Sequence, residues 1–451
     1  MKEQSDRTDK TRAQRKLTRR EILRAAATAA TAPYVLTSGA LGAAGLAPAS
    51  DRITVACVGV RNRGSRHLKN LLAGGDVEVL AVCDVDQAVR RRAVNRVAGA
   101  RERRWSTTGR GQPAQTGDYR QIAARGDIDA VVIATPDHTH AVIALEMLRA
   151  GLNVYVEKPI ALTVREGRAV AAAAAAGGLV VQAGCQRRSS RKYRLACDLV
   201  RRGAIGRLVS IEVCIPRRSI IPTPWSPEPV PAGFDYDAWL GPAPLAPYTA
   251  GRCHYNWRFI RDYSGGELTG PALHGLDLAQ WAIAADGGGP VAVEGVGECC
   301  KAGLYDAFYR VNVRWTYANG VKLICRGGSD AATRLVGTDG WLEAESLRAS
   351  SPDIFTNGAA CAAAGDGESL AGASAGGSHM RDFLAAVRAA RPDAAAAGAE
   401  TGHRTASLCR LGEIAMRLGR QLRWDPAGEC FPDDAEAQEM THRPYRRPWT
   451  L

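Results

Sequence analysis

The chain has 451 residues, of which 46% are hydrophobic, and it carries a formal net charge of +13. This length is sufficient for two domains with hydrophobic cores. The excess of basic residues could indicate a nucleic-acid ligand, but the sequence has neither interleaved basic and aromatic residues nor the spacing of a zinc finger. We therefore interpret the charge as solvated basic faces, and we expect no nucleic-acid partner.

The first 49 residues have the pattern of an export signal. The run Lys16-Leu-Thr-Arg19-Arg20-Glu-Ile-Leu-Arg24 matches the twin-arginine motif, and Ala47-Pro-Ala49 is a plausible cleavage site. The stretch between them is too poor in Leu, Ile and Phe for a stable membrane span in the mature protein. The alternatives are a retained anchor and a basic disordered tail. We expect a periplasmic or otherwise exported protein.

Strands and helices alternate over residues 50–183. Near-continuous apolar runs predict buried strands at 53–60, 77–84, 130–135, 153–157 and 179–183. Helical spacing predicts helices at 65–73, 86–98 and 163–176, and another that follows the segment 136–140 and ends at Ala150. This alternation predicts an α/β domain with a doubly wound parallel sheet.

The turn after the first strand indicates a dinucleotide site. Glycines at Gly59 and Gly64 would let a pyrophosphate approach the amides that begin the next helix. Asp84, which ends the second strand, could accept hydrogen bonds from both ribose hydroxyls, and this favours NAD over NADP. Arg61 replaces the middle glycine, and Arg61 and Arg63 could instead accommodate a 2′-phosphate. The alternative is an ordinary strand-to-helix turn with a surface acid.

A second pattern, Glu157-Lys158-Pro159, follows the strand that begins at residue 153. Open α/β sheets bind ligands at the carboxyl ends of their strands. A lysine in that place can be partly desolvated and can exchange a proton with a substrate hydroxyl. The alternative is a solvated Glu-Lys pair.

These patterns together resemble the Gfo/Idh/MocA oxidoreductases, the family of glucose-fructose oxidoreductase and inositol dehydrogenase. The resemblance covers roughly residues 52–451. It depends on the elements described above, on Ala134-Thr135-Pro136-Asp-His-Thr-His140, and on Gly265 to Asp277, which contains His274-Gly-Leu-Asp277. The tail from Trp424 to Trp449 is similar to a secreted bacterial branch of the family.

The resemblance implies roles for individual residues. Lys158 would assist proton transfer at the reacting carbinol, and His274 would be the second acid–base group, facing the nicotinamide. Many members carry an aspartate four residues before this histidine, where this chain has Gly270. Asp277 could compensate from one helical turn beyond His274, or it could be a helix-packing acid. The expected cofactor-binding residues are Gly59, Arg61, Asn62, Arg63, Gly64, Asp84, Thr135, Pro136, His140, Glu157 and Lys158.

Residues 184–451 are expected to form a substrate-binding and oligomerisation domain of the α+β type. Strands are predicted at 208–215, 291–297, 309–316, 321–326 and 333–337, and helices at 191–202, 379–390 and 403–419. The proline-rich stretch over 216–248 predicts a functional loop whose aromatic residues stack on a sugar, cover a neighbouring subunit or anchor the loop. Residues 359–377 predict a flexible surface loop. In the family the sheet supports subunit contacts, which implies a homodimer or homotetramer.

The expected function is therefore an exported NAD(P)-dependent oxidoreductase. It would move a hydride between a carbinol carbon of a sugar, glycoside or cyclitol and a tightly bound nicotinamide. The expected substrate contacts are Tyr193, Arg258, His274 and His403. One alternative is a glycosidase that uses NAD for transient oxidation and elimination; another is a catalytically silent sugar-binding protein, suggested by Arg61 and Gly270. The cysteines lack paired CxxC spacing, so we expect no metal site.

Overall fold

The structure is a computed structural model that describes residues 47–104, 112–217, 220, 224–300, 302–356 and 378–451. The predicted export signal over 1–49 lies almost entirely outside these ranges, and so does the predicted surface loop over 359–377. Among the described residues, no helix combines the length and the apolar character needed to cross a membrane.

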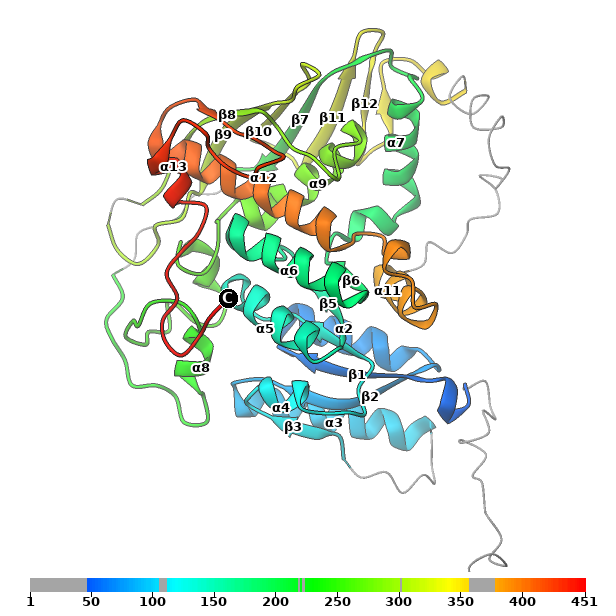
Figure 1. Ribbon diagram of the computed structural model, residues 1–451, viewed down its shortest axis with the longest axis vertical. Helices are drawn as coiled ribbons and strands as arrows, with labels where there is room; N and C mark the ends of the chain where they lie inside the picture. Colours follow the sequence, from blue (N-terminus) through cyan, green and yellow to red (C-terminus); the bar gives the residue numbers. More distant parts are fainter. Residues whose placement is uncertain (1–46, 105–111, 218–219, 221–223, 301, 357–377) are drawn as a thin grey trace, which may run out of the picture.

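Residues 53–183 form a sheet of six parallel strands in the order β3-β2-β1-β4-β5-β6, which confirms the doubly wound α/β fold (Figure 1). Its strands are β1 (Ile53–Val58), β2 (Val77–Cys83), β3 (Ala114–Thr116), β4 (Ala130–Ile133), β5 (Asn153–Val156) and β6 (Val181–Ala183). Its helices are α2 (Asn62–Ala73), α3 (Gln87–Arg104), α4 (Arg120–Ala123), α5 (Asp137–Arg149) and α6 (Val164–Gly177). The short elements β3 and α4 were not predicted, because three or four residues carry no measurable periodicity.

Both faces of this sheet are buried, as its apolar runs require. Helices α5 and α6 cover one face, and α2 and α3 cover the other. A later helix, α11 (His379–Arg388), returns to the second face and buries Met380, Phe383 and Leu384 there. The first domain therefore includes α11, in addition to the contiguous residues 50–183 expected from the sequence.

The second domain contains a sheet of eight strands in the order β13-β12-β11-β7-β10-β9-β8-β14. Among the strands that the structure describes here, only the β7–β10 pair is parallel, which confirms the mostly antiparallel character. The strands are β7 (Leu208–Pro216), β8 (Ala292–Glu298), β9 (Arg310–Thr316), β10 (Lys322–Gly328), β11 (Ala332–Gly337), β12 (Trp341–Glu343), β13 (Arg348–Ala349) and β14 (Leu422–Arg423). One face carries α7 (Arg191–Arg201), α9 (Leu273–Ile283) and α12 (Ala399–Leu418), and α12 also packs against α6 of the first domain (Figure 1).

Two segments of the second half reach the first domain. Residues 224–263, with α8 (Tyr236–Leu240) and the 3₁₀ turn η3 (Asn256–Phe259), build an aromatic core of their own that contains Phe234, Trp239 and Tyr263. After α13 (Ala435–Glu439), the C-terminal tail runs past α8 towards α5 (Figure 1). Phe234, Tyr236 and Trp239 of the proline-rich loop thus anchor it, which was one of the alternatives. Trp239 and, beyond the loop, Trp257 also line the cleft described next.

Candidate active site

A cleft of about 940 Å³ opens between the two domains at the carboxyl ends of β1, β2, β4 and β5. The order of the strands reverses between β1 and β4, which is where doubly wound sheets bind ligands. Twelve of the predicted site residues line this cleft: Gly59, Arg61, Asn62, Arg63, Asp84, Thr135, Pro136, His140, Glu157, Lys158, Arg258 and His274.

The turn from β1 to α2 forms a cradle for a pyrophosphate. Gly59 has a φ of +77°, and a Cβ there would lie 2.8 Å from the backbone of Ala134 and Thr135. Gly64 packs so closely beneath the turn that a Cβ would overlap the carbonyl oxygen of Gly59. Arg61, the N-cap residue of α2, makes no side-chain cap, so the first amides of this helix are available to an anion.

The carboxylate of Asp84 is fixed at the end of β2. It accepts hydrogen bonds from the backbone amides of Val60, at 2.9 Å, and Asp86, at 3.0 Å. Burial raises the pKa of Asp84, and these two hydrogen bonds oppose that rise. An acid in this position fits the ribose hydroxyls of NAD.

Lys158 connects the two domains at the centre of the cleft. Its Nζ donates hydrogen bonds to the carbonyl oxygens of Thr269, at 2.9 Å, and Gly270, at 2.7 Å. Both carbonyls belong to the π-helical turn η4 (Leu268–Ala272), which contains Pro271. Burial lowers the pKa of Lys158, and the nearby carboxylates Asp137 and Glu157 oppose this effect.

His274 faces the same cleft from the start of α9. Burial, followed by the positive charges of Lys158 and Arg187, lowers the pKa of His274 to about 3. The imidazole is therefore neutral near pH 7. Within the described part of the chain neither ring nitrogen has a hydrogen-bond partner, so His274 can bind a hydroxyl of a ligand.

His140 holds two of the strand ends that carry the site. Its Nδ1 lies 2.7 Å from the carbonyl oxygen of Pro159, and its Nε2 lies 2.9 Å from that of Thr135. These contacts fix the loop after β5 against the loop after β4.

Asp137 is a buried acid of the cleft that the sequence reasoning missed. It lies in the first turn of α5, and its carboxylate accepts a hydrogen bond of 2.8 Å from Ser264 Oγ. Burial raises the pKa of Asp137, and the charges of His140 and Lys158 oppose that rise. No carboxylate stands at Gly270, where an added Cβ would meet nothing within 4 Å. Asp137 and Glu157 are therefore the acids that act on Lys158.

Besides Gly64, which packs beneath the glycine turn, three of the predicted site residues do not line the cleft. Asp277 is 1% exposed and accepts hydrogen bonds from Arg188 Nε, at 2.9 and 3.1 Å, and from Thr405. These contacts favour the alternative in which Asp277 is a helix-packing acid and does not compensate for the missing aspartate beside His274. Tyr193 packs against the core of the second domain, with the guanidinium of Arg187 over its ring.

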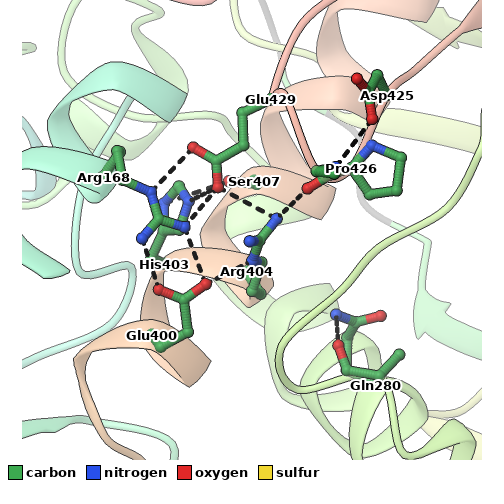
Figure 2. Close-up of polar contacts among 11 residues, drawn as sticks. Arg168, Gln280, Glu400, His403, Arg404, Ser407, Asp425, Pro426 and Glu429 are labelled. Carbon is green, nitrogen blue, oxygen red and sulfur yellow. Dashed lines mark hydrogen bonds and ion pairs between the residues drawn. The ribbon is translucent and has the colours of Figure 1, made fainter. Parts of the chain in front are cut away.

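His403 is the third of these residues, and it lies in an ionic cluster between the domains (Figure 2). It is fully buried, and its Nε2 lies 2.7 Å from Glu429 Oε1. Arg168 of α6 makes two hydrogen bonds to Glu400, at 2.7 and 2.8 Å, and also bonds Glu429. Because this cluster joins α6 to α12 and to the loop after β14, His403 is a structural residue here rather than a substrate contact.

This cluster predicts acid sensitivity. Burial raises the pKa of Glu429, but His403 and Arg168 outweigh that effect and hold it at about 2. A carboxyl with a depressed folded-state pKa stabilises the protein above its unfolded pKa, and the contribution is lost as the pH falls towards 2. We expect the melting temperature of Glu429→Gln to depend less on pH between about 4.5 and 2 than that of the wild type. The exposed Glu439→Gln is the control; equal pH dependence in all three proteins would contradict this assignment.

No group of three or more His, Cys, Asp or Glu residues suited to a metal ion occurs within the described ranges. The cleft also includes residues to which the sequence reasoning gave no role, among them Tyr119, Arg120, Asp237 and Trp449. Their positions depend on long-range packing, which the local pattern does not report.

Comparison with known proteins agrees with this geometry. The description "Oxidoreductase family, NAD-binding Rossmann fold" matches residues 53–185, and "Oxidoreductase family, C-terminal alpha/beta domain" matches residues 222–451. Two curated relatives are called glycosyl hydrolase family 109 proteins. That of Shewanella sp. (strain W3-18-1) is 40% identical and that of Shewanella baltica (strain OS155 / ATCC BAA-1091) is 38% identical, each over 125 residues. Each match covers 27% of this chain and 26% of the relative, about a quarter of its length.

Solved structures share the fold. GenD2 from gentamicin A biosynthesis, in complex with NAD, has a TM-score of 0.59 at 21% identity, covering 83% of this chain and 97% of that one. WlbA dehydrogenase from Bordetella pertussis, with NADH and UDP-GlcNAcA, has a TM-score of 0.59 at 17% identity, covering 83% and 99%. The matches to both domains, together with the glycine turn, Asp84 and Lys158, show that the chain belongs to the Gfo/Idh/MocA family of NAD-binding oxidoreductases.

Proposed function

We propose that the protein is an exported oxidoreductase that moves a hydride between a carbinol carbon of a sugar, glycoside or cyclitol and a nicotinamide that stays bound. The observation that carries this proposal is that Lys158 and His274 face the cleft that begins at the Gly59–Asp84 cradle. Bound NAD would supply the hydride acceptor, because no protein side chain can serve as one.

The contacts of Lys158 suit it to accept the carbinol proton. A neutral amine has two N–H groups and one lone pair. The carbonyls of Thr269 and Gly270 take both N–H groups, so the lone pair of Nζ is left for the substrate hydroxyl. Burial lowers the pKa of Lys158 and so favours this neutral form. His274 would then hold a neighbouring hydroxyl and orient the carbinol.

Retention of the nucleotide is supported by a cover over the cleft, which we define as residues 233–241 and 443–449. The backbone amide of Asp235 donates a hydrogen bond to the carbonyl oxygen of Val85, and the amide of Gln87 donates one to that of Gly233. These bonds attach the cover to the segment that follows Asp84. Arg446 bonds Asp237 at 2.6 Å, and its guanidinium carbon lies 4.4 Å from the ring centroid of Trp449.

We expect Trp449→Ala to release nucleotide on the order of tenfold faster than the wild type. This factor corresponds to a decrease of about 1.4 kcal/mol in the free-energy barrier to release. Trp449 is 9% exposed and lines the cleft, so its removal opens the cover. The nucleotide-to-protein ratio after repeated gel filtration measures this loss. Trp341→Ala, on β12, is the control, and equal retention in both variants would contradict a role for the cover.

The test of the proposed function is a single-turnover assay of the purified protein against a panel of sugars, glycosides and cyclitols. Absorbance at the wavelength of reduced nicotinamide should rise with one class of substrate, and a second carbonyl acceptor should restore the starting state. Failure of every class to change the bound nucleotide would contradict the proposal.

The glycosidase alternative is favoured by the similarity to glycosyl hydrolase family 109 proteins. An enzyme of that kind would release free sugar from a glycoside without net formation of NADH. Chromogenic aryl glycosides distinguish the two activities, because only the glycosidase liberates the phenol while the nicotinamide absorbance returns to its starting value.

Export and oligomeric state are also proposals. The twin-arginine pattern at residues 16–24 supports export of the folded, nucleotide-loaded protein. Fractionation of cells that express the full chain tests it, with Arg19→Lys/Arg20→Lys expected to stay in the cytoplasm. The homodimer or homotetramer that we expect is tested by light scattering.

A further inference from the structure

A second cavity, of about 610 Å³, lies beside the cleft, between α2, β5 and the starts of α7 and α11. Four cationic side chains line it: Arg63, Arg66, Lys69 and Arg191. No aspartate or glutamate lines it in the described part of the chain. The positive charges of Arg63, Arg66 and Lys69, three residues of α2, would attract an anion into this cavity.

The backbone around the cavity also favours an anion. Ser190 is the N-cap residue of α7 and makes no side-chain cap, whereas Ser378, the N-cap residue of α11, accepts a hydrogen bond from the amide of Arg381. Both serines line the cavity, so the uncapped N-terminus of α7 opens onto it. His67 also lines it; the residue is 6% exposed, and its Nδ1 has no partner within the described ranges.

The cavity adjoins the active site through Glu157. Arg63 lines both the cavity and the cleft, and its Nε lies 3.8 Å from Glu157 Oε1. The same carboxylate lies 2.7 Å from His67 Nε2 and accepts a hydrogen bond of 2.8 Å from Gln186. A group bound in the cavity would therefore sit next to the residue that precedes Lys158.

We propose that this second cavity binds an oxyanion group: a carboxylate, a sulfate or a phosphate. Guanidinium and ammonium groups recognise such anions through charge-assisted hydrogen bonds. The volume also admits a sugar ring that carries the acidic group. The group arrives either on an acidic sugar unit of the substrate or as a free anion. The first source rests on the proposed function, whereas binding itself is measured without turnover.

The test uses calorimetry on the nucleotide-loaded full chain with inorganic phosphate, sulfate and glucuronate as acidic probes and glucose as the neutral probe. Arg66 and Lys69 are exposed residues of α2, and Arg91 and Arg92 are exposed residues of α3 that line neither cavity. The variants Arg66→Ala/Lys69→Ala and Arg91→Ala/Arg92→Ala therefore remove equal charge. We expect the acidic probes to bind the first variant about tenfold or more weakly than the second, because charged hydrogen bonds are lost.

The probes also separate the two sources. Glucuronate that binds about tenfold more tightly than phosphate and sulfate supports an acidic sugar unit, whereas equal affinities support a free anion. Equal binding of every acidic probe to both variants, or glucose binding as tightly as glucuronate, would overturn the proposal. The nucleotide content of the same samples is read by absorbance, so a failure of the cofactor assignment is seen separately.

Discussion

Lys158→Ala is expected to keep its bound nucleotide and to lose hydride transfer by about 10²- to 10⁴-fold, the usual contribution of a positioned acid–base group. The nucleotide cradle is built by Gly59, the start of α2 and Asp84, so removal of Nζ leaves it in place. The loss arises because Nζ of Lys158 is the group that the carbonyls of Thr269 and Gly270 hold at this position.

Lys322→Ala, an exposed position on β10, is the matched control for loss of a lysine. Nucleotide content by absorbance and single-turnover reduction are measured on both variants. Unchanged turnover in Lys158→Ala would sink the role proposed for this residue. If Lys158→Ala were purified without nucleotide, the hydrogen bonds of Lys158 to Thr269 and Gly270 would instead be needed to hold the nucleotide-binding turn in place.

The second large effect is expected on stability. Arg188 is 5% exposed and pairs with both Asp277 and Asp286, so Arg188→Ala would leave the carboxyl of Asp277 buried without its cationic partner. Removal of one partner of a buried ion pair lowers the free energy of unfolding by about 3–5 kcal/mol. Denaturant unfolding of the purified protein should show a decrease of this size in the free energy of unfolding.

Arg334→Ala is the control, because Arg334 is an exposed residue of β11 whose nearest carboxylate oxygen, in Glu343, lies 3.7 Å away. Exposed ion pairs contribute roughly 0–1 kcal/mol to the free energy of unfolding. Equal destabilisation in the two variants would contradict a buried ion pair at Asp277. Asp277→Asn that retained the stability of the wild type but lost turnover would restore the catalytic interpretation of this acid.

The sequence predicted most of the first domain because buried parallel strands leave a strong local signal. The runs at 53–60 and 130–135 became β1 and β4, and the first ends at Val58 because Gly59 takes a positive φ. The cofactor-binding residues could also be recognised. The glycine turn follows the first strand and Asp84 ends the second, and in a doubly wound sheet these two strands are neighbours with their carboxyl ends on the same edge.

What the sequence did not predict depends on contacts between distant segments. The apolar face of α11 is visible in the sequence, but nothing local shows that it packs against α2. Likewise, the C-terminal tail gave no indication that Trp449 would line the cleft. His403 was expected to contact the substrate, yet its contact with Glu429, to which Arg168 also donates, places it between the domains.

The resemblance also left the missing aspartate at Gly270 unexplained. The structure places Asp137 in the same cleft, where its charge acts on Lys158. Its sequence signal was an acid in the first turn of a helix after Pro136, and such acids usually stabilise the helix N-terminus alone. Only the fold distinguishes the two roles, because it buries this acid beside Ser264.

The nucleotide that the purified protein releases on denaturation is the most direct evidence for NAD in the cleft that contains Lys158. We expect mass spectrometry to find NAD or NADH in a one-to-one ratio with the chain, without any added cofactor. If no nucleotide is found, even after incubation with NAD and NADP, the cleft does not hold the cofactor and a sugar-binding protein without catalytic activity is favoured.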